Sequence, residues 1–254
     1  MKTPIITLTC DFGDQFAAGQ IESVIYGINP RAKFILASKE VTPYSIIEGA
    51  FIIQKFVPFT LENSIHIGVV DPGVGSDRIG IIIKSKNHWF VGPNNGLLYP
   101  GANQDEIEKA YKIDEEKIGS LSNTFHGRDI FAKVAAYLSL SKPIVEYASE
   151  INRDQLILLQ YSQNQVLHID PYGNIKLNNN ALYTTRDKLE LKINEKSYII
   201  PFVKTFAEVS VGEPLAYKGS HDTLEIAVNQ INAAQHFGLK IEQQIQVQKV
   251  GEQQ

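Results

Sequence analysis

Short β-rich runs alternate with segments of helical periodicity over the first 140 residues, and this alternation restricts the fold of the chain more than any other feature. Between the first two strand-like runs, apolar residues recur at spacings of three and four from Ile21 to Ile28 and share one helix face. Asn29-Pro30 then ends the helix. Such alternation predicts a largely parallel sheet with helices on both faces. The expected strands are 5–9, 34–37, 64–70, 79–84 and 88–91, and the expected helices carry their apolar faces at 21–28, 46–57 and 131–138.

The pattern changes after Pro143, where short strand-like runs follow one another without long helices between them. Turn residues such as Gly173-Asn174 and Gly212 separate these runs. This spacing is typical of an antiparallel barrel or a small sandwich. We therefore expect an α/β domain over residues 1–150 and a β domain over residues 151–254. The expected strands of the second domain are 156–159, 166–169, 189–193, 198–200, 224–228 and 244–247, with a short helix at 232–237.

Composition and charge exclude several classes of protein. The 254 residues carry a net charge of −4 and include no basic run, so we expect no nucleic-acid partner. No apolar stretch approaches the ~20 residues that span a bilayer, so we expect no membrane partner. The single cysteine, Cys10, excludes an internal disulfide framework and fits a reducing compartment. We therefore predict a cytoplasmic protein.

Three acidic residues directly follow apolar strand-like runs and precede glycine-containing turns. They are Asp11, Asp71 and Asp170. Ligands of open α/β sheets bind outside the carboxyl ends of the strands, which places Asp11 and Asp71 in the favoured zone. Asp and Gly also form turns for purely structural reasons, and the repetition of the arrangement is what favours a site.

A second cluster of polar residues, 124–129, precedes the helical pattern at 131–138. His126 lies outside the apolar stripe of that helix, next to a glycine. It has no neighbouring His or Cys that would indicate zinc, and a lone histidine is more often structural than catalytic. The turn-rich loop at 92–96 lacks the spacing of a phosphate-binding loop or a dinucleotide fingerprint.

Taken alone, these residues leave two classes of function open. One is a metal-dependent hydrolase, and the other is a protein that binds a small molecule without catalysis. The candidate ligands of the hydrolase are Asp11, Asp14, Asp71, His126 and Asp129.

Longer motifs narrow this choice, because they occur in a fixed order along nearly the whole chain. They cover residues 9–13, 69–75 with Arg78, 92–98, 124–131, 169–174 and 224–229. In these motifs the chain resembles the S-adenosyl-L-methionine hydroxide adenosyltransferases. These enzymes are adenosine-forming S-adenosylmethionine hydrolases and are related to the fluorinase and chlorinase enzymes.

The resemblance implies an N-terminal α/β domain, a C-terminal antiparallel β-barrel and a homotrimer with the substrate between neighbouring subunits. It also implies a catalytic triad of Asp71, Arg78 and His126. The halogenating relatives lack this triad, so its presence favours water over halide as the nucleophile. The implied reaction is attack of water or hydroxide on ribose C5′, which releases methionine. A sulfonium already leaves readily, so we expect no metal and no other cofactor.

The resemblance further implies how the substrate S-adenosyl-L-methionine is held. Asp11 matches the carboxylate that accepts both ribose hydroxyls. Tyr172 is expected to stack on adenine and Asn174 to bind its polar edge. Ser220 and Glu225 match segments near the methionine end. The remaining expected substrate-binding residues are Asp170, Asn232 and Ala233.

The chain departs from the family pattern at several positions. Asn94 stands where Asp is usual, and Lys39 and Lys133 replace a common His and a common Pro. Residues 221–223 replace a more glycine-rich segment near the expected methionine end. None of these departures affects the triad.

Overall fold

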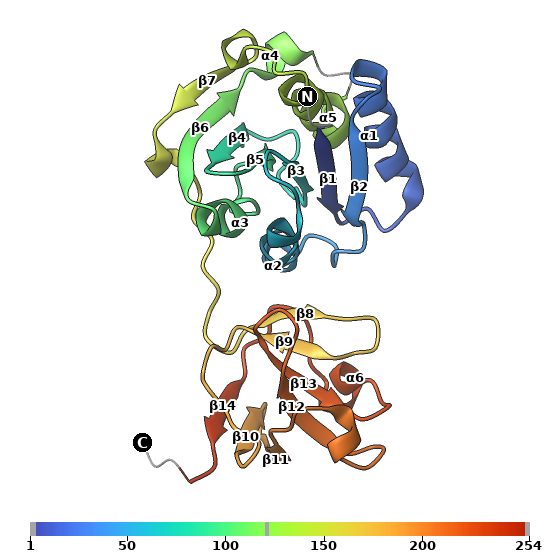
Figure 1. Cartoon of the computed structure of the whole chain (residues 1–254), viewed down its shortest axis with the longest axis vertical. Coiled ribbons are helices and arrows are strands. Elements are labelled where there is room, and N and C mark those ends of the chain that lie inside the picture. Colours follow the sequence, from blue (N-terminus) through green and yellow to red (C-terminus); the bar gives the residue numbers. More distant parts are fainter. Residues whose placement is uncertain (1–3, 120–121, 252–254) are drawn as a thin grey trace. The chain divides into compact units, whose positions relative to one another are not determined.

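The computed structural model describes residues 4–119 and 122–251, and the chain divides into two compact units. The first unit extends to Gln160 and the second begins at Tyr161 (Figure 1). Each unit contains its own cluster of buried apolar side chains. Within the described residues, no helix is both long and apolar enough to cross a membrane.

The described part of the N-terminal unit contains a seven-stranded mixed sheet. Its strands are β1 (Ile5–Cys10), β2 (Lys33–Ser38), β3 (Ile65–Val69), β4 (Gly80–Ser85), β5 (Trp89–Pro93), β6 (Ile107–Ile113) and β7 (Ala148–Ile151), in the spatial order β2-β1-β3-β5-β4-β6-β7. The neighbours β2, β1, β3 and β5 are parallel. β4 is antiparallel to both β5 and β6, and β7 is antiparallel to β6. The sheet is thus mostly parallel in strand direction, but its β4-β6-β7 half is paired in antiparallel fashion.

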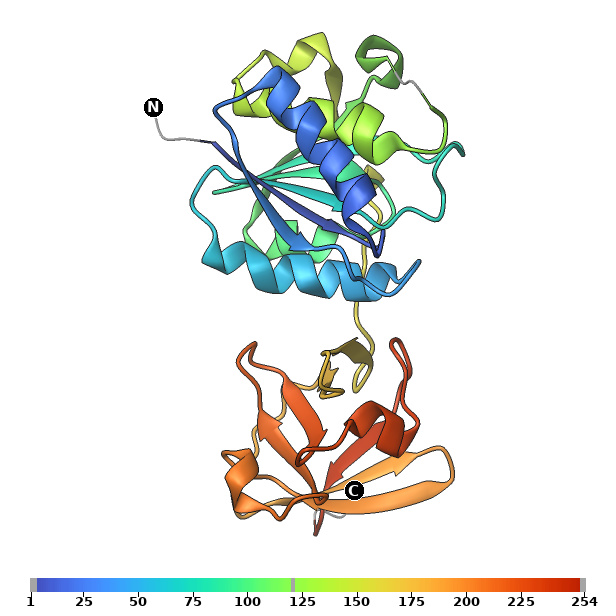
Figure 2. The ribbon, with the colours of Figure 1, turned by 90° about the vertical axis from the view of Figure 1, so that its right-hand side faces the viewer.

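Helices cover both faces of this sheet, as the alternation predicts (Figure 2). They are α1 (Gln15–Ile28), α2 (Ile46–Phe56), α3 (Tyr99–Gln104), α4 (Glu115–Ile118), the π-helical turn η2 (Gly127–Phe131) and α5 (Ala132–Ser139), with short 3₁₀ turns η1 (Val57–Phe59), η3 (Ile144–Glu146) and η4 (Arg153–Gln155). α1 and α5 lie on one face, and α2 and α3 on the other. Asp14 and Ser45 cap α1 and α2 by accepting hydrogen bonds from backbone N–H groups of the first turn.

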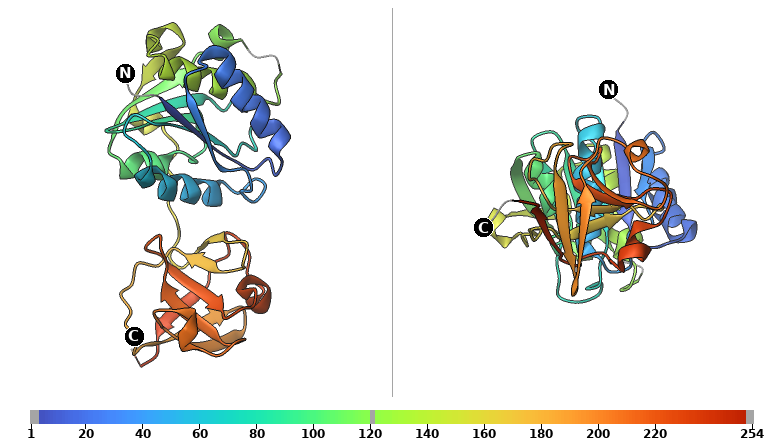
Figure 3. Two further views of the ribbon diagram at one scale, coloured as in Figure 1. Left: turned by 45° about the vertical axis from the view of Figure 1, so that its right-hand side comes forward. Right: turned by 90° about the horizontal axis from the view of Figure 1, so that it is seen from below.

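The C-terminal unit is built from antiparallel strands, with one short helix on its outside (Figure 3). Its elements are β8 (Val166–Ile169), β9 (Ile175–Leu177), β10 (Lys188–Ile193), β11 (Lys196–Pro201), η5 (Phe206–Glu208), β12 (Pro214–Lys218), β13 (Leu224–Val228), α6 (Ala233–Phe237) and β14 (Gln246–Lys249). In the described residues the strands form a four-stranded sheet, β12-β13-β9-β8, and a three-stranded sheet, β11-β10-β14. Gly238, in the left-handed conformation at φ 68°, ends α6 where the sequence predicts.

One predicted strand is absent and several observed elements lack a sequence signal. Residues 156–159 form no strand, and the side chain of Asn94 binds the backbone at the start of this segment. Its Nδ2 donates to the Gln155 carbonyl at 2.9 Å, and its Oδ1 accepts from the Ile157 N–H at 3.0 Å. β6 was not predicted because charged residues interrupt its apolar positions, and β9, with three residues, is too short to give a clear pattern.

Candidate active site

Three of the sequence motifs come together at the carboxyl ends of the parallel strands. Cys10 of β1 pairs with Val69 of β3, so the chain leaves both strands at the same edge of the sheet. Asp11 and Asp71 follow these strand ends. The ring of Phe12 packs edge-on against Phe125, with centroids 5.5 Å apart, which joins the Asp-Phe-Gly loop to the segment that carries His126. The N-terminal motifs therefore form one locus.

Arg78 binds the carboxylate of Asp71 through two of its nitrogens. Nε lies 3.1 Å from Oδ1 and 3.0 Å from Oδ2, and Nη2 lies 2.6 Å from Oδ2. The side chains of Arg78 and Asp71 are 10% and 5% exposed, so water screens the pair little. This fork geometry holds the guanidinium in one orientation.

The same guanidinium also contacts His126. Nη2 of Arg78 lies 2.7 Å from Nδ1 of the imidazole. Because a guanidinium has no acceptor, Arg78 donates this hydrogen bond and Nδ1 accepts it. A neutral imidazole that accepts at Nδ1 carries its proton on Nε2. The structure therefore brings Asp71, Arg78 and His126 into one hydrogen-bonded cluster, in which Arg78 is the central member.

Local backbone geometry explains how two chain segments supply this cluster. Gly75 adopts φ +77° in the turn between Asp71 and Arg78, and a Cβ there would lie 2.7 Å from the carbonyl oxygen of Asn123. His126 lies at the start of the π-helical turn η2, which the sequence predicted as a loop before the helix. Such turns are frequent at functional sites because they redirect side chains. Beneath the cluster, the ring of Phe131 lies 5.5 Å from the Arg78 guanidinium.

A fourth charged residue, Glu115, joins the cluster and was not predicted from the sequence. Its Oε1 accepts from Nη1 of Arg78 at 3.3 Å, and its Oε2 lies 3.5 Å from Nδ1 of His126. It begins the short helix α4, whose cap is Asp114. In the sequence it belongs to an Asp-Glu-Glu run that resembles an ordinary helix start, so only the pairing of β6 with β4 could have placed it near Arg78.

The other candidate metal ligands do not join this cluster. Asp14 caps α1, and Asp129 pairs with Arg128 at 2.7 Å. Asp11 accepts a hydrogen bond from the backbone N–H of Tyr44 at 2.8 Å. Within residues 4–119 and 122–251, no three His, Cys, Asp or Glu side chains converge as a group that could hold a metal ion.

The predicted adenine-binding residues lie in the C-terminal unit, in the loop between β8 and β9. Asp170 organises this loop: its Oδ1 accepts from the N–H groups of Tyr172 and Asn174, and its Oδ2 accepts from the Asn174 amide at 2.9 Å. The ring of Tyr172 is 80% exposed and does not pack into the core. A rigid loop thus presents an exposed aromatic face, which is what stacking on a base requires.

Asn232 and Ala233 adjoin this loop. The Asn232 side chain caps α6 by accepting from the Gln235 N–H at 2.8 Å, and it lies against Gly173 so closely that a Cβ there would overlap it at 2.2 Å. Ala233 is fully buried. Any contact of Ala233 with a ligand would therefore involve its backbone.

Glu225 is buried in a second cluster of charged groups. Its Oε1 accepts from Lys176 at 2.7 Å and its Oε2 from the Tyr217 hydroxyl at 2.6 Å. Burial and the Glu225 carboxylate raise the pKa of Tyr217. Ser220 is exposed and lies 3.3 Å from Nδ1 of His221. Both oxygens of Glu225 thus have partners within the chain, and its contact with an ammonium group stays a prediction.

Comparison with known proteins identifies the family. Residues 6–148 match the N-terminal domain of the SAM hydroxide adenosyltransferases, and residues 164–246 match their C-terminal domain. The chain belongs to this family. The resemblance found in the sequence motifs is therefore confirmed, and each matched domain falls within one of the two compact units.

Individual relatives agree with this assignment. The chain is 35% identical over 209 residues to an (R)-S-adenosyl-L-methionine hydrolase of Methanocaldococcus jannaschii. This alignment covers 79% of this chain and 77% of that protein. It is 31% identical to a protein of the same name from Salinispora tropica, over 93% of this chain and 95% of that protein. A crystal structure of an uncharacterized conserved protein from Thermotoga maritima superposes with a TM-score of 0.87 at 28% identity, covering 96% and 99% of the two chains.

Proposed function

We propose that the protein hydrolyses S-adenosyl-L-methionine to adenosine and L-methionine by attack of a water oxygen on ribose C5′. Membership of the SAM hydroxide adenosyltransferase family supports an enzyme of this kind, as do relatives named for the hydrolysis of (R)-S-adenosyl-L-methionine. The observation that carries the mechanism is the cluster in which one guanidinium binds both the Asp71 carboxylate and the His126 imidazole.

The reaction requires little beyond a positioned and activated water. The water oxygen forms a bond to C5′ while the C5′–S bond breaks, and the electron pair of the C5′–S bond returns to sulfur. Methionine leaves as a neutral thioether, so no general acid is needed. Because free water has a pKa of about 15.7, a fixed positive charge beside it favours loss of its proton to a base. Arg78 supplies a charge that does not titrate, and the cluster supplies the base.

The chemistry of the leaving group also makes a metal unnecessary. A divalent cation beside a positively charged sulfonium would be repelled, and the leaving group needs no Lewis acid. Positioned acid–base groups typically contribute about 10²–10⁴-fold to a rate, and alignment of water with the C–S bond contributes further. We therefore propose catalysis without metal or other cofactor.

We propose that substrate binding divides between the two units. Asp11 binds the ribose hydroxyls beside the cluster, while Tyr172 and Asn174 bind adenine, assisted by the loop around Asp170 and Asn232. Ser220, Glu225 and Ala233 keep their predicted places near the two ends of the substrate. The reacting groups belong to the N-terminal unit and the exposed aromatic ring to the C-terminal unit, which supports a homotrimer with each site between neighbouring subunits.

We also propose that the C-terminal strands form a closed antiparallel barrel. Two isolated bridges support closure: Gln165 pairs with Gln244 in antiparallel fashion beside β8 and β14, and Phe202, just after β11, pairs with Ala216 of β12 in parallel fashion, so that the closing contact is the one parallel pairing among the described residues of this unit. With these bridges, the order β12-β13-β9-β8-β14-β10-β11 returns to β12. A cytoplasmic location, supported by the buried free thiol of Cys10, completes the proposal.

Product analysis tests this function. Purified protein is incubated with each sulfonium epimer of S-adenosyl-L-methionine, with and without EDTA, and adenosine and methionine are quantified by liquid chromatography. We expect equal amounts of both products, unchanged by the chelator. Tight binding in calorimetry without product would instead indicate a non-catalytic binding protein. Activity lost on chelation and restored by a divalent ion would indicate a metal-dependent hydrolase.

A further inference from the structure

Nδ1 of His126 faces two partners of opposite character. Nη2 of Arg78, 2.7 Å away, can only donate a hydrogen bond to it, whereas the Glu115 carboxylate, with Oε2 3.5 Å away, can only accept one. Arg78 and Glu115 thus approach the imidazole from neighbouring elements, and Asp71 lies behind Arg78. On the element of His126 itself, Arg128 and Asp129 pair with each other. Nδ1 can satisfy only one of its two partners at a time.

The choice of partner determines what the other ring nitrogen can do. While Nδ1 accepts from Arg78, a neutral ring carries its proton on Nε2 and can only donate there. When the imidazole exchanges its hydrogen bond from Arg78 for one to Glu115, Nδ1–H donates to the carboxylate, and Nε2 has a free lone pair that can accept a proton from water. The resulting imidazolium would face a carboxylate across Nδ1, which stabilises its charge.

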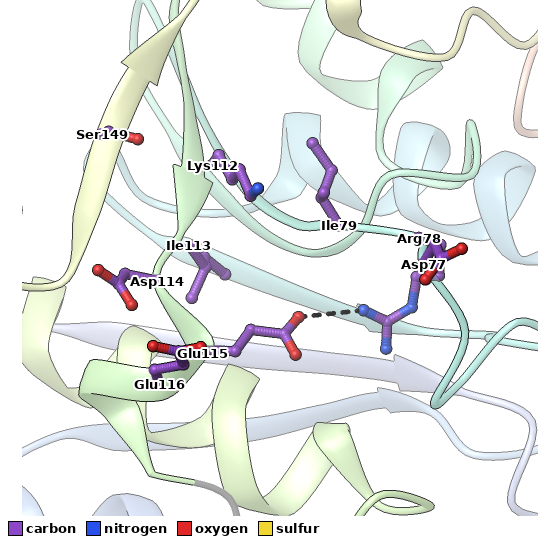
Figure 4. A pocket seen from close by; sticks show the side chains of 9 residues that line it. All are labelled: Asp77, Arg78, Ile79, Lys112, Ile113, Asp114, Glu115, Glu116 and Ser149. Atoms are coloured by element: carbon purple, nitrogen blue, oxygen red, sulfur yellow. Dashed lines mark hydrogen bonds and ion pairs between the residues drawn. The ribbon is translucent and has the colours of Figure 1, made fainter.

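The surroundings of Glu115 allow this function. Gly80 leaves room for it, since a Cβ at that position would lie 3.2 Å from Oε1. Figure 4 shows Glu115 extending from α4 to Arg78, at the wall of a polar cavity of about 710 Å³ within the N-terminal unit. Its side chain is 32% exposed, so solvent supports its negative charge.

We propose that Glu115 is a positioning residue that draws the proton of His126 onto Nδ1 and so makes Nε2 the base for the attacking water. In the reaction, the water oxygen bonds to C5′, the C5′–S electron pair returns to sulfur, and the water proton moves to Nε2 of His126. The imidazolium then releases a proton to solvent, and the cycle closes without any other reactant. This role rests on the proposed hydrolysis.

Kinetics of Glu115→Gln, with Glu116→Gln as the matched control, test this role. Glu116 is exposed, lies on the same helix and lines the same cavity, so its substitution removes the same charge. We expect E115Q to lower kcat about 10–100-fold, to leave KM within about twofold, and to move the acid limb of kcat/KM to lower pH. We expect Glu115→Asp to recover part of kcat and E116Q to match the wild type. Wild-type kinetics in E115Q, or equal losses in E115Q and E116Q, would overturn the proposal.

A readout independent of turnover separates this role from the proposed hydrolysis. Protein labelled with ¹⁵N-histidine reports the tautomer of His126, whose signals are assigned by comparison with His126→Gln. We expect E115Q and E115D, but not E116Q, to change the His126 ring shifts, with E115Q moving them toward the Nε2–H form. Unchanged shifts in E115Q would overturn the role of Glu115. Absence of product from the wild type would instead overturn the hydrolysis.

Discussion

Each unit buries a cluster of charged side chains, and the two clusters differ in their balance of charge. In the C-terminal unit, Lys176 faces Glu225, and the second oxygen of that carboxylate is taken by a tyrosine hydroxyl. In the N-terminal unit, one guanidinium faces the two carboxylates of Asp71 and Glu115 and the imidazole of His126. The first cluster is neutral. The second carries one excess negative charge while the imidazole is neutral, and so has capacity for one proton.

This difference teaches that burial and charge pairing alone do not mark a catalytic site. A neutral, fully paired cluster such as that of Glu225 fixes one arrangement of its strands. A cluster with excess carboxylate beside a titratable ring can take up the proton that a reacting water must lose. We therefore expect changes in the two clusters to affect different properties of the protein.

Removal of Arg78 should produce the largest effect on turnover. In Arg78→Met the charge beside the water is lost and the two carboxylates repel each other, so we expect kcat to fall about 10³-fold or more. Arg78→Lys restores a charge but not the fork, and it should recover only a small part of kcat. Steady-state rates of adenosine release measure both. Turnover in R78M within tenfold of the wild type would contradict the role of the cluster.

Substitution of Lys176 should instead act on stability. Lys176→Met leaves Glu225 charged and buried at 3% exposure, and we expect the free energy of unfolding to fall by about 3–5 kcal/mol. Urea unfolding followed by circular dichroism measures this loss. The control is Lys218→Met, which breaks an exposed pair with Asp222 and should change stability by less than about 1 kcal/mol. Equal losses in the two variants would show that the buried pair has no special weight.

His66 is a third titratable group, a buried ring that hydrogen-bonds to no carboxylate among the residues the structure describes. Burial lowers its pKa to about 3, and its ring nitrogens contact Thr7 and His88. Below its ordinary pKa of about 6.5 the unfolded chain binds a proton that the folded chain does not, so stability falls as pH drops. Between pH 7 and pH 5 we expect a loss of about 2 kcal/mol from this group. Urea midpoints across this range should fall less in His66→Asn. An identical pH slope in the variant would contradict the assignment.

The smallest predicted effect concerns the exposed ring of Tyr172. Tyr172→Ala should raise KM about tenfold through lost stacking, with kcat changed less than threefold. Tyr172→Phe keeps the aromatic face and should resemble the wild type. Neither variant should alter stability, since the ring is 80% exposed. A fall in the unfolding midpoint without a change in KM would assign Tyr172 to packing.

Local patterns in the sequence predicted much of the fold, and long-range pairing accounts for what they missed. Periodicity placed α1, α2 and the strands up to β5, because each follows from the spacing of neighbouring apolar residues. The antiparallel pairing of β4 with β6 was missed because β6 has the pattern of a charged segment and lies far from β4 in the sequence. Residues 156–159 have the pattern of a strand, and no local signal marks the hydrogen bonds of Asn94 to Gln155 and Ile157.

The candidate site divides in the same way. Family motifs named Asp71, Arg78 and His126, which the structure brings together, since each motif carries its own recognisable turn. The sequence motifs did not reveal the roles of Glu115 and Lys176. Their partners lie far away in the sequence, and their local sequence resembles that of an ordinary helix and an ordinary strand. The sequence predicted Asp170 as a substrate-binding residue but did not show that its carboxylate accepts three hydrogen bonds within its own loop.

Turnover in ¹⁸O-labelled water, analysed by mass spectrometry, tests most directly whether the N-terminal cluster directs water to C5′. We expect one ¹⁸O atom in the 5′-hydroxyl of adenosine, none in methionine, and labelled adenosine formed at least about 10³-fold more slowly by R78M. Adenosine without the label, or labelled adenosine formed by R78M at the wild-type rate, would contradict the central claim.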